Sequence, residues 1–169
     1  IDSKTLQIDK FLFTNVSRET LVELEDYSKE VITRNRTINL ISKNTEKSFK
    51  IRHITDSAQT IDFIDKNDIK ICTDIGSGAG LPGIVLGILM KSKKPLFKVI
   101  FYEKSYHKSV FIEKMSKKFN LNSEIHQKNI FNEKGLRTDV IISRAFKPLP
   151  IIFQIAQTNF KNFKYIIIF

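Results

Sequence analysis

Cysteine, glycine and long apolar runs are all scarce in this chain of 169 residues. Its one cysteine, Cys72, cannot form an internal disulfide or a cysteine metal cluster, so we expect a protein of the reducing cytoplasm. The longest apolar run, at 83–90, is far shorter than the about 20 residues that a membrane span needs. No amino-terminal segment combines a basic start with an apolar core, so we expect no secretory signal and no membrane partner.

Familiar catalytic groupings are also missing. The sequence contains no Ser-His-Asp order, no cluster with metal-ligand spacing and no paired-carboxylate motif. The sequence therefore predicts no bound metal, and these patterns identify no catalytic acid or base.

Acidic residues are outnumbered, with 28 Lys and Arg against 18 Asp and Glu and a formal net charge of +10. This balance favours a polyanionic partner such as RNA, because phosphate contacts are mostly electrostatic. An A+T-rich coding sequence and the ordinary lysine surface of an α/β domain explain it equally simply. The lysines that crowd the middle of the chain are Lys91, Lys93, Lys94, Lys98, Lys104, Lys108, Lys114, Lys117 and Lys118.

Four of the six glycines fall within the segment 74–83, Asp-Ile-Gly-Ser-Gly-Ala-Gly-Leu-Pro-Gly. Apolar runs lie on both sides of it, which predicts a strand, a tight turn and a helix opened by Pro82. Such a turn brings backbone N–H groups and a helix N-terminus close to a ligand. In open α/β sheets, nucleotide-like cofactors bind at this position, beyond the carboxyl ends of the strands.

Two cofactor classes compete for this turn. Gly78-x-Gly80-x-x-Gly83 satisfies the dinucleotide fingerprint, and Glu103 lies at about the expected distance of 20 residues. The whole run, Asp-x-Gly-x-Gly-x-Gly, resembles the first motif of S-adenosylmethionine-dependent methyltransferases. A carboxylate at Asp74 would repel a pyrophosphate but attract the cationic amino and sulfonium end of S-adenosylmethionine. A methyltransferase is therefore favoured, and an NAD-dependent Rossmann oxidoreductase remains the alternative.

The chain is expected to form a single domain, 1–169, with a helical preface at 1–66 and an α/β core at 67–169. Ser17 can cap a first helix, and Thr45 can cap a second amphipathic segment. From Ile69 onward, predicted strands and helices alternate, which indicates a doubly wound, mostly parallel sheet. The predicted strands are 69–74, 97–102, 124–127, 139–142 and 163–169, and the predicted helices are 82–90, 106–119 and 150–160.

The last predicted strand has the composition of a central, doubly covered strand. Nothing follows to cover or pair it, and the chain does not begin with methionine. We therefore expect the sequence to be part of a longer protein, with its C-terminal strands missing.

Candidate binding residues follow three of the predicted strands. Glu103 is placed to accept hydrogen bonds from ribose hydroxyls, unless it simply pairs with a neighbouring lysine. Asn129 and Ile130 could hold an adenine with one polar group and an apolar wall. Arg144 could reach a cofactor carboxylate or an RNA phosphate, or it could pair with an acid of the second helix.

A further polar group precedes the core. Arg52 and Asp56 are four residues apart and would share a face of a helix, with His53 adjoining it. On the residues alone, an ion pair within the helix with a packing histidine is the favoured interpretation.

Together these segments resemble one family, the bacterial 16S ribosomal RNA guanine-N7 methyltransferases, also called glucose-inhibited division protein B. The resemblance covers nearly the whole chain, and the Leu-Pro-Gly extension of the glycine segment makes it specific. The matching motifs are Asn39-Leu40, Arg52-His53-x-x-Asp56-Ser57, the segment 74–83 and Ser143-Arg144-Ala145.

The resemblance implies a class I methyltransferase fold and transfer of a methyl group from S-adenosylmethionine to N7 of a guanine in the decoding-region loop of 16S rRNA. Guanine N7 carries an in-plane lone pair that can attack directly, so no general base is expected. The protein is expected to act as a monomer on 16S rRNA or the small subunit. A non-catalytic RNA-binding factor with this fold remains a further alternative.

The resemblance also implies roles for individual residues. The implied cofactor contacts are Asp74, Gly76, Gly78, Leu81, Glu103, Asn129, Ile130 and Arg144. The implied RNA side of the pocket contains Asn39, Arg52, His53, Asp56 and Lys147, with Lys147-Pro148 departing from the family pattern.

Overall fold

The fold is built on a five-stranded sheet in which all neighbouring strands are parallel. The computed structural model describes residues 16–169, and for residues 50–52 it describes the backbone only. The central strands are apolar and buried, as expected of parallel strands that are covered on both faces. In order across the sheet, the strands are β3 (Ser123–His126), β2 (Lys98–Tyr102), β1 (Ile71–Ile75), β5 (Val140–Ser143) and β7 (Tyr165–Ile168).

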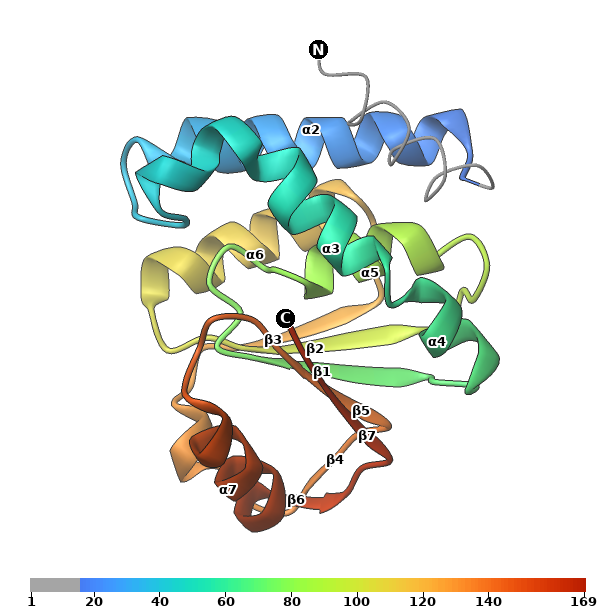
Figure 1. Cartoon of the computed structure of the whole chain (residues 1–169), viewed down its shortest axis with the longest axis vertical. Helices are drawn as coiled ribbons and strands as arrows, with labels where there is room; N and C mark the ends of the chain where they lie inside the picture. The colour runs from blue at the N-terminus through green and yellow to red at the C-terminus, as the bar shows by residue number, and fades with distance from the viewer. Residues whose placement is uncertain (1–15) are drawn as a thin grey trace.

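Helices cover both faces of this sheet (Figure 1). α5 (Gly83–Met90) and α6 (Tyr106–Lys118) lie on one face, and α7 (Leu149–Asn159) lies on the other. Every residue of α5 is buried, because this uniformly apolar helix lies between the sheet and the preface. The predicted doubly wound, parallel α/β fold is thereby confirmed.

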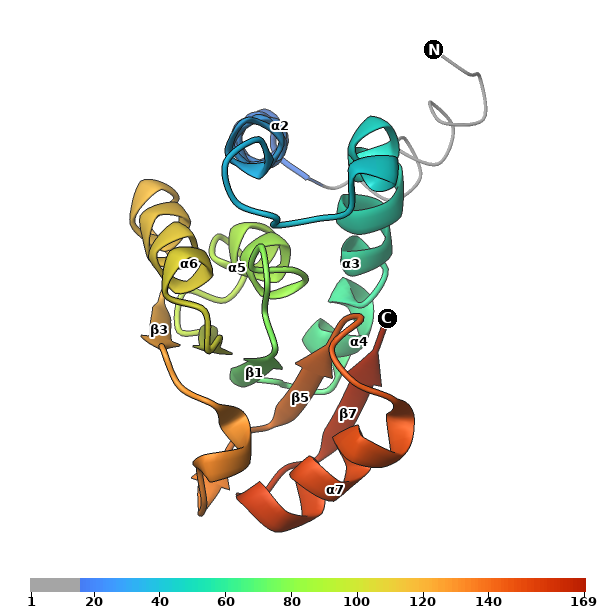
Figure 2. The same ribbon diagram turned by 90° about the vertical axis from the view of Figure 1, so that its left-hand side faces the viewer.

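The helical preface forms a further layer over α5 and α6 (Figure 2). α2 (Arg18–Asn35) begins at Ser17, whose Oγ accepts a hydrogen bond from the backbone N of Thr20 at 3.2 Å, as predicted. Tyr27 and Val31 of this helix are completely buried. α2 therefore packs on the core through the apolar face that the sequence indicates.

The second part of the preface is less regular than the sequence predicts. Thr45 lies inside a short helix instead of capping one. The segment consists of a 3-10 helix η1 (Lys43–Ser48), a π-helix η2 (Lys50–Thr55), α3 (Asp56–Ala58) and α4 (Ile61–Lys66).

Predicted and observed elements of the core agree to within a few residues, as is usual at helix and strand ends. Val110 of α6 is 42% exposed. The packed face of this helix instead buries Ser109 and Ser116 beside its apolar residues Phe111, Ile112 and Met115. Three short elements were not predicted, namely η3 (Ile130–Asn132), β4 (Leu136–Arg137) and β6 (Phe160–Asn162), and β4 pairs with β6.

Candidate functional site

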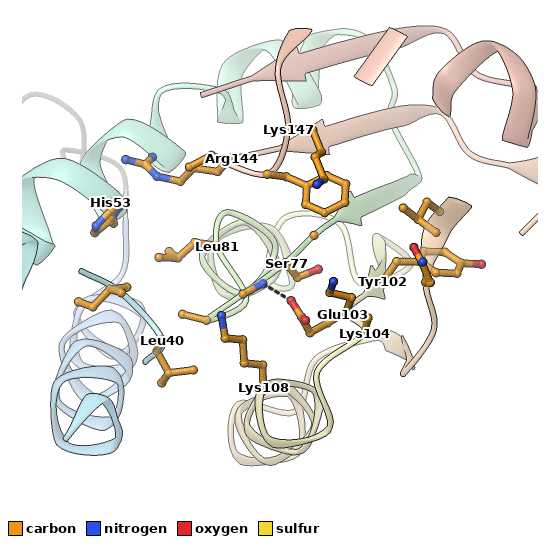
Figure 3. A pocket seen from close by; sticks show the side chains of 18 of the residues that line it. Leu40, His53, Ser77, Leu81, Tyr102, Glu103, Lys104, Lys108, Arg144 and Lys147 are labelled. Carbon is orange, nitrogen blue, oxygen red and sulfur yellow. Dashed lines mark hydrogen bonds between the residues drawn. The ribbon is translucent and has the colours of Figure 1, made fainter. Parts of the chain in front are cut away.

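A pocket of about 770 Å³ lies beyond the carboxyl ends of β1, β2 and β5. Its floor is the glycine segment between β1 and α5, and the preface supplies one wall (Figure 3). Leu40 and His53 come from the preface, Leu81 from the glycine segment and Glu103 from the end of β2. The pocket therefore stands at the position where open α/β sheets bind their ligands.

Residues 76–83 of the glycine segment, which we call the cofactor loop after the role that the sequence predicts for them, are held by hydrogen bonds to their backbone. Gly76 N donates to Tyr102 O and Gly78 N donates to Glu103 Oε2, both at 2.9 Å. Gly76, Gly78 and Gly80 have φ values of +70°, +57° and +87°, in the left-handed region that only glycine adopts without strain. The glycines are therefore required by the shape of the loop.

Asp74 does not face the pocket, contrary to the expectation that its carboxylate meets the cofactor. The side chain is completely buried, and Oδ2 accepts a hydrogen bond from Gly83 N at 2.9 Å. Burial raises the pKa of the Asp74 carboxyl well above its usual range. Asp74 is thus a structural group that fixes the start of α5, and it gives no direct electrostatic discrimination between cofactors.

Glu103 lines the pocket and is 8% exposed. Its Oε2 accepts from Gly78 N (Figure 3), and its Oε1 accepts from Ser105 N at 2.8 Å. The carboxylate thus bonds to backbone amides on both sides, where the sequence also allowed a pair with a neighbouring lysine. It connects the end of β2 to the cofactor loop and presents negative charge to the pocket.

Beyond β5, Arg144 both lines the pocket and forms an ion pair. Its Nη2 lies 3.2 Å from Asp56 Oδ2 of α3, so the structure shows the pairing with an acid, while the predicted contact with a cofactor carboxylate or an RNA phosphate stays a prediction. Asp56 itself is not among the lining residues. This ion pair joins the preface to the carboxyl end of the sheet across the pocket.

The chain after Arg144 folds back over the cofactor loop. Ala145 has a φ of +48°, a strained conformation for a residue with a side chain. The Phe146 ring lies so close to Gly76 that a Cβ on Gly76 would come within 2.1 Å of it. Lys147 Nζ lies 5.9 Å from the centre of the Phe146 ring, and both residues line the pocket. Gly76 is needed here for close approach as well as for its φ.

The preface wall depends on a residue that the sequence analysis passed over. Asn35 is buried, and its Oδ1 accepts hydrogen bonds from Leu40 N at 2.8 Å and Ile41 N at 2.9 Å. Asn39, predicted to border the pocket, is exposed and not among the lining residues. The side chain of Arg52 lies outside the described part of the structure.

Asn129 and Ile130 lie at the opposite end of the pocket. Asn129 Oδ1 accepts a hydrogen bond from Phe131 N at 3.3 Å and thereby caps η3. Ile130 is 2% exposed, and Phe131 is partly exposed beside it. This end of the pocket therefore combines an apolar wall with a polar group that is already partly engaged.

Some lysines form ion pairs between helices, and others line the pocket. Between α2 and α6, Lys118 pairs with Asp26 and Glu30 at 2.8 Å, and Lys114 pairs with Glu30 at 3.0 Å. Four other lysines line the pocket: Lys104, Lys108, Lys128 and Lys147. Of these, Lys128 pairs with Glu133 at 3.2 Å. Lys114 and Lys118 are thus engaged in ion pairs between helices, and the positive charge at the pocket comes from other lysines.

Among the predicted site residues, the structure brings together Gly76, Gly78, Leu81, Glu103, Asn129, Ile130, Arg144, His53 and Lys147. The lining residues that sequence reasoning did not single out for the pocket include Ser42, Thr45, Ser77, Tyr102, Lys104, Lys108, Lys128, Phe131 and Phe146. Most of these adjoin a predicted site residue in the chain, so proximity to a strand end was the signal that could have found them.

Over 16–169, no helix is both long and apolar enough to cross a bilayer. Within the same range, no three His, Cys, Asp or Glu side chains are grouped so that they could hold a metal ion.

Comparisons with solved structures show the fold. An O-methyltransferase from Bacillus cereus, in complex with S-adenosylhomocysteine, has a TM-score of 0.58 at 19% identity, covering 89% of this chain and 66% of that one. A Podospora anserina methyltransferase, also bound to S-adenosylhomocysteine, has a TM-score of 0.56 at 12% identity, covering 85% of this chain and 58% of that one. The α/β core therefore has the same fold as these two proteins.

Sequence comparisons show the family. The chain is 49% identical to the ribosomal RNA small subunit methyltransferase G of Pelagibacter ubique, over 92% of this chain and 73% of that protein. It is 39% identical to the protein of the same name from Cereibacter sphaeroides, over 80% of this chain and 64% of that protein. A family model described as rRNA small subunit methyltransferase G matches residues 20–169. The chain thus spans about two thirds to three quarters of these relatives, and it belongs to the rRNA small subunit methyltransferase G family, as its motifs indicated.

Proposed function

We propose that this protein binds S-adenosylmethionine on the cofactor loop and methylates N7 of a guanine in the decoding-region loop of 16S rRNA. The observation that carries the proposal is the open face of the loop at Gly78. A Cβ built there meets nothing closer than Gly76 O at 4.0 Å, although Gly78 lines a pocket of about 770 Å³. Family membership supports the reaction class.

The residues of the pocket fit this cofactor. Glu103 offers a carboxylate to the ribose hydroxyls, and Ile130 with Phe131 offers an apolar wall to the adenine. Arg144 lines the pocket and can attract the carboxylate of the amino-acid end, while it also pairs with Asp56. When bound, S-adenosylmethionine supplies an electrophilic methyl group attached to a positively charged sulfur.

The chemistry requires little of the protein beyond placement. Guanine N7 carries an in-plane lone pair at neutral pH, so no residue has to remove a proton before the attack. Holding the reacting atoms in line contributes about 7–11 kcal/mol in favourable cases. This agrees with a pocket in which Glu103 is the one acidic side chain among the described lining residues, and its oxygens accept backbone hydrogen bonds.

The same pocket suits an RNA loop. Lys104, Lys108 and Lys147 line it, and no ion pair with an acid is seen for them among the described residues. These three lysines, of which Lys104 and Lys108 belong to the mid-chain group, are the proposed phosphate contacts, whereas Lys94 pairs with Asp65 at 3.3 Å. The guanine has to be unstacked to reach the pocket, as sequence-specific RNA recognition commonly requires.

We infer that the chain works as a single methyltransferase domain, as a monomer in the cytoplasm, on 16S rRNA or the small subunit, without a metal. The preface at 1–66 contributes the RNA side of the pocket, where His53 and the segment around Asn39 adjoin the opening. Arg52 and Asp56 belong to the same side, with Asp56 acting through its ion pair to Arg144.

The decisive experiment is to map N7-methylguanine in small-subunit RNA from cells with and without the protein. One guanine in the decoding-region loop should lose its methyl group when the protein is absent and regain it when the protein is restored. A Gly78→Val variant should fail to restore it. An unchanged methylation map would refute the proposal, and methylation elsewhere in the RNA would refute the assigned target. A non-catalytic RNA-binding factor would leave the map unchanged while still binding RNA.

A further inference from the structure

One hydrogen bond joins the helical preface directly to the cofactor loop. The hydroxyl of Tyr27, on α2, donates to the backbone carbonyl of Ala79 at 2.9 Å, across 52 residues of sequence. Tyr27 is completely buried and Ala79 is 2% exposed, so the bond is shielded from water. A buried carbonyl that loses its donor is costly, because water cannot replace the missing partner.

Ala79 lies in the glycine-rich part of the loop. It stands between Gly78 and Gly80, whose φ values are +57° and +87°. Glycine adopts several backbone conformations at similar cost, so local sterics alone fix the peptide groups around Ala79 only weakly. Hydrogen bonds hold the loop at Gly78 N and at Gly83 N, and within the loop Gly80 N donates to Ser77 O at 2.7 Å. Tyr27 adds a hydrogen bond from the preface to the Ala79 carbonyl, which lies between these points.

The Tyr27 ring is itself firmly placed. It makes edge-to-face contacts with Phe49 at 6.1 Å and with Phe119 at 6.4 Å between ring centres. Burial, and then the nearby Asp74, raises the pKa of the Tyr27 hydroxyl well above its usual range, so it keeps its proton as a donor. Phe49 also contacts the ring of His53 at 5.2 Å, and His53 lines the pocket.

We propose that Tyr27 is a positioning residue for the cofactor, which holds the Ala79 carbonyl inward and so keeps the loop in its binding shape. The inference rests on the proposed function, since it concerns the same pocket. Tyr27 is not among the residues that line the pocket, so it acts through residues that do, and Ala79 is the one to which its hydroxyl is bonded. Its loss should therefore weaken cofactor binding and leave the rate of methyl transfer at saturation nearly unchanged.

The test is Tyr27→Phe in the full chain, which removes the hydroxyl and keeps the ring. The Kd for S-adenosylhomocysteine, measured by calorimetry, should rise about 5- to 30-fold, the range that one buried hydrogen bond supports. KM for S-adenosylmethionine should rise by a similar factor while kcat stays within about twofold. Hydrogen exchange should quicken at the amides of the cofactor loop and stay unchanged in α6.

Tyr165→Phe is the matched control. Tyr165 lies on β7, outside the pocket lining, and its hydroxyl lies 3.2 Å from Asn67 Oδ1, so the variant removes a hydrogen-bonded tyrosine hydroxyl elsewhere in the fold. It should leave the Kd unchanged. The inference is overturned if Tyr27→Phe binds S-adenosylhomocysteine within twofold of the wild type, or if kcat falls while KM does not change. If the wild type itself does not bind, the proposed function fails instead.

A second variant covers the case in which Tyr27→Phe does not fold. Phe49→Leu keeps the hydroxyl and loosens the ring that supports it, so the Kd should rise by about two- to fivefold, less than for Tyr27→Phe. An unchanged Kd in this variant would also count against the positioning role.

Discussion

The open face of the cofactor loop gives the sharpest prediction, the effect of Gly78→Ala. Its φ of +57° costs a residue with a side chain about 1–2 kcal/mol. No protein atom lies closer than 4.0 Å to the added Cβ, so no clash adds to this cost within the protein. Because domains of this kind unfold with about 5–15 kcal/mol, the variant should remain folded.

Binding should suffer more than folding. The new methyl group stands on the loop face that we assign to the cofactor, so the affinity for S-adenosylhomocysteine should fall roughly tenfold or more, about 1.4 kcal/mol per tenfold. Isothermal calorimetry measures the affinity, and urea unfolding measures the stability.

Gly135→Ala is the matched control for this variant. Gly135 has a φ of +71° and lies outside the pocket lining, and a Cβ there would meet only Lys161 Cε at 3.6 Å. It should lose a similar amount of stability and bind S-adenosylhomocysteine normally. Equal, wild-type affinity in both variants would show that the loop face at Gly78 does not meet the ligand.

Three further predictions follow from the pocket and its surroundings. Lys104→Ala and Lys108→Ala should each weaken binding to the RNA loop and reduce the slope of log K against log salt by about 0.7–0.9, whereas Lys94→Ala should leave that slope unchanged in a fluorescence titration. Glu103→Gln should lower the affinity for S-adenosylhomocysteine by roughly tenfold, because a neutral amide is a weaker acceptor for ribose hydroxyls; calorimetry showing no loss would remove Glu103 from the site. Asp74→Asn should flatten the dependence of stability on pH. Burial raises the pKa of Asp74 in the folded state, so the wild-type free energy of unfolding should fall as pH rises from about 4 through the folded pKa. Urea titrations over this pH range measure the slope, and a free energy of unfolding that rises with pH would contradict the reasoning.

The sequence predicted the sheet and the location of the pocket because both depend on local patterns. Buried parallel strands must be apolar, and a left-handed turn between a strand and a helix must contain glycine, so β1, α5 and the loop between them could be placed from residues 69–90 alone. Glu103 followed from the same rule, since the end of the next strand adjoins the loop.

The sequence could not show where individual polar groups point. Asp74 was expected to face the pocket, yet its carboxylate is buried in the core, where it accepts a hydrogen bond from the backbone N of Gly83. Asn35 was overlooked in favour of Asn39, because only the fold shows that Asn35 is buried against the backbone of residues 40–41. The pairing of Arg144 with Asp56 joins residues 88 positions apart, a distance over which no local pattern operates.

The ion pairs between α2 and α6 have a consequence for how the protein meets its substrate. Lys114 and Lys118 form ion pairs with the acids of α2, which offset their charge. The electrostatic field at a distance from the molecule therefore depends more on cations elsewhere, including those at the pocket opening. An uneven field of this kind exerts a torque on a protein that diffuses toward a polyanion. The molecule would then turn its opening toward a polyanionic partner before the two surfaces touch, and collisions in other orientations would be less frequent.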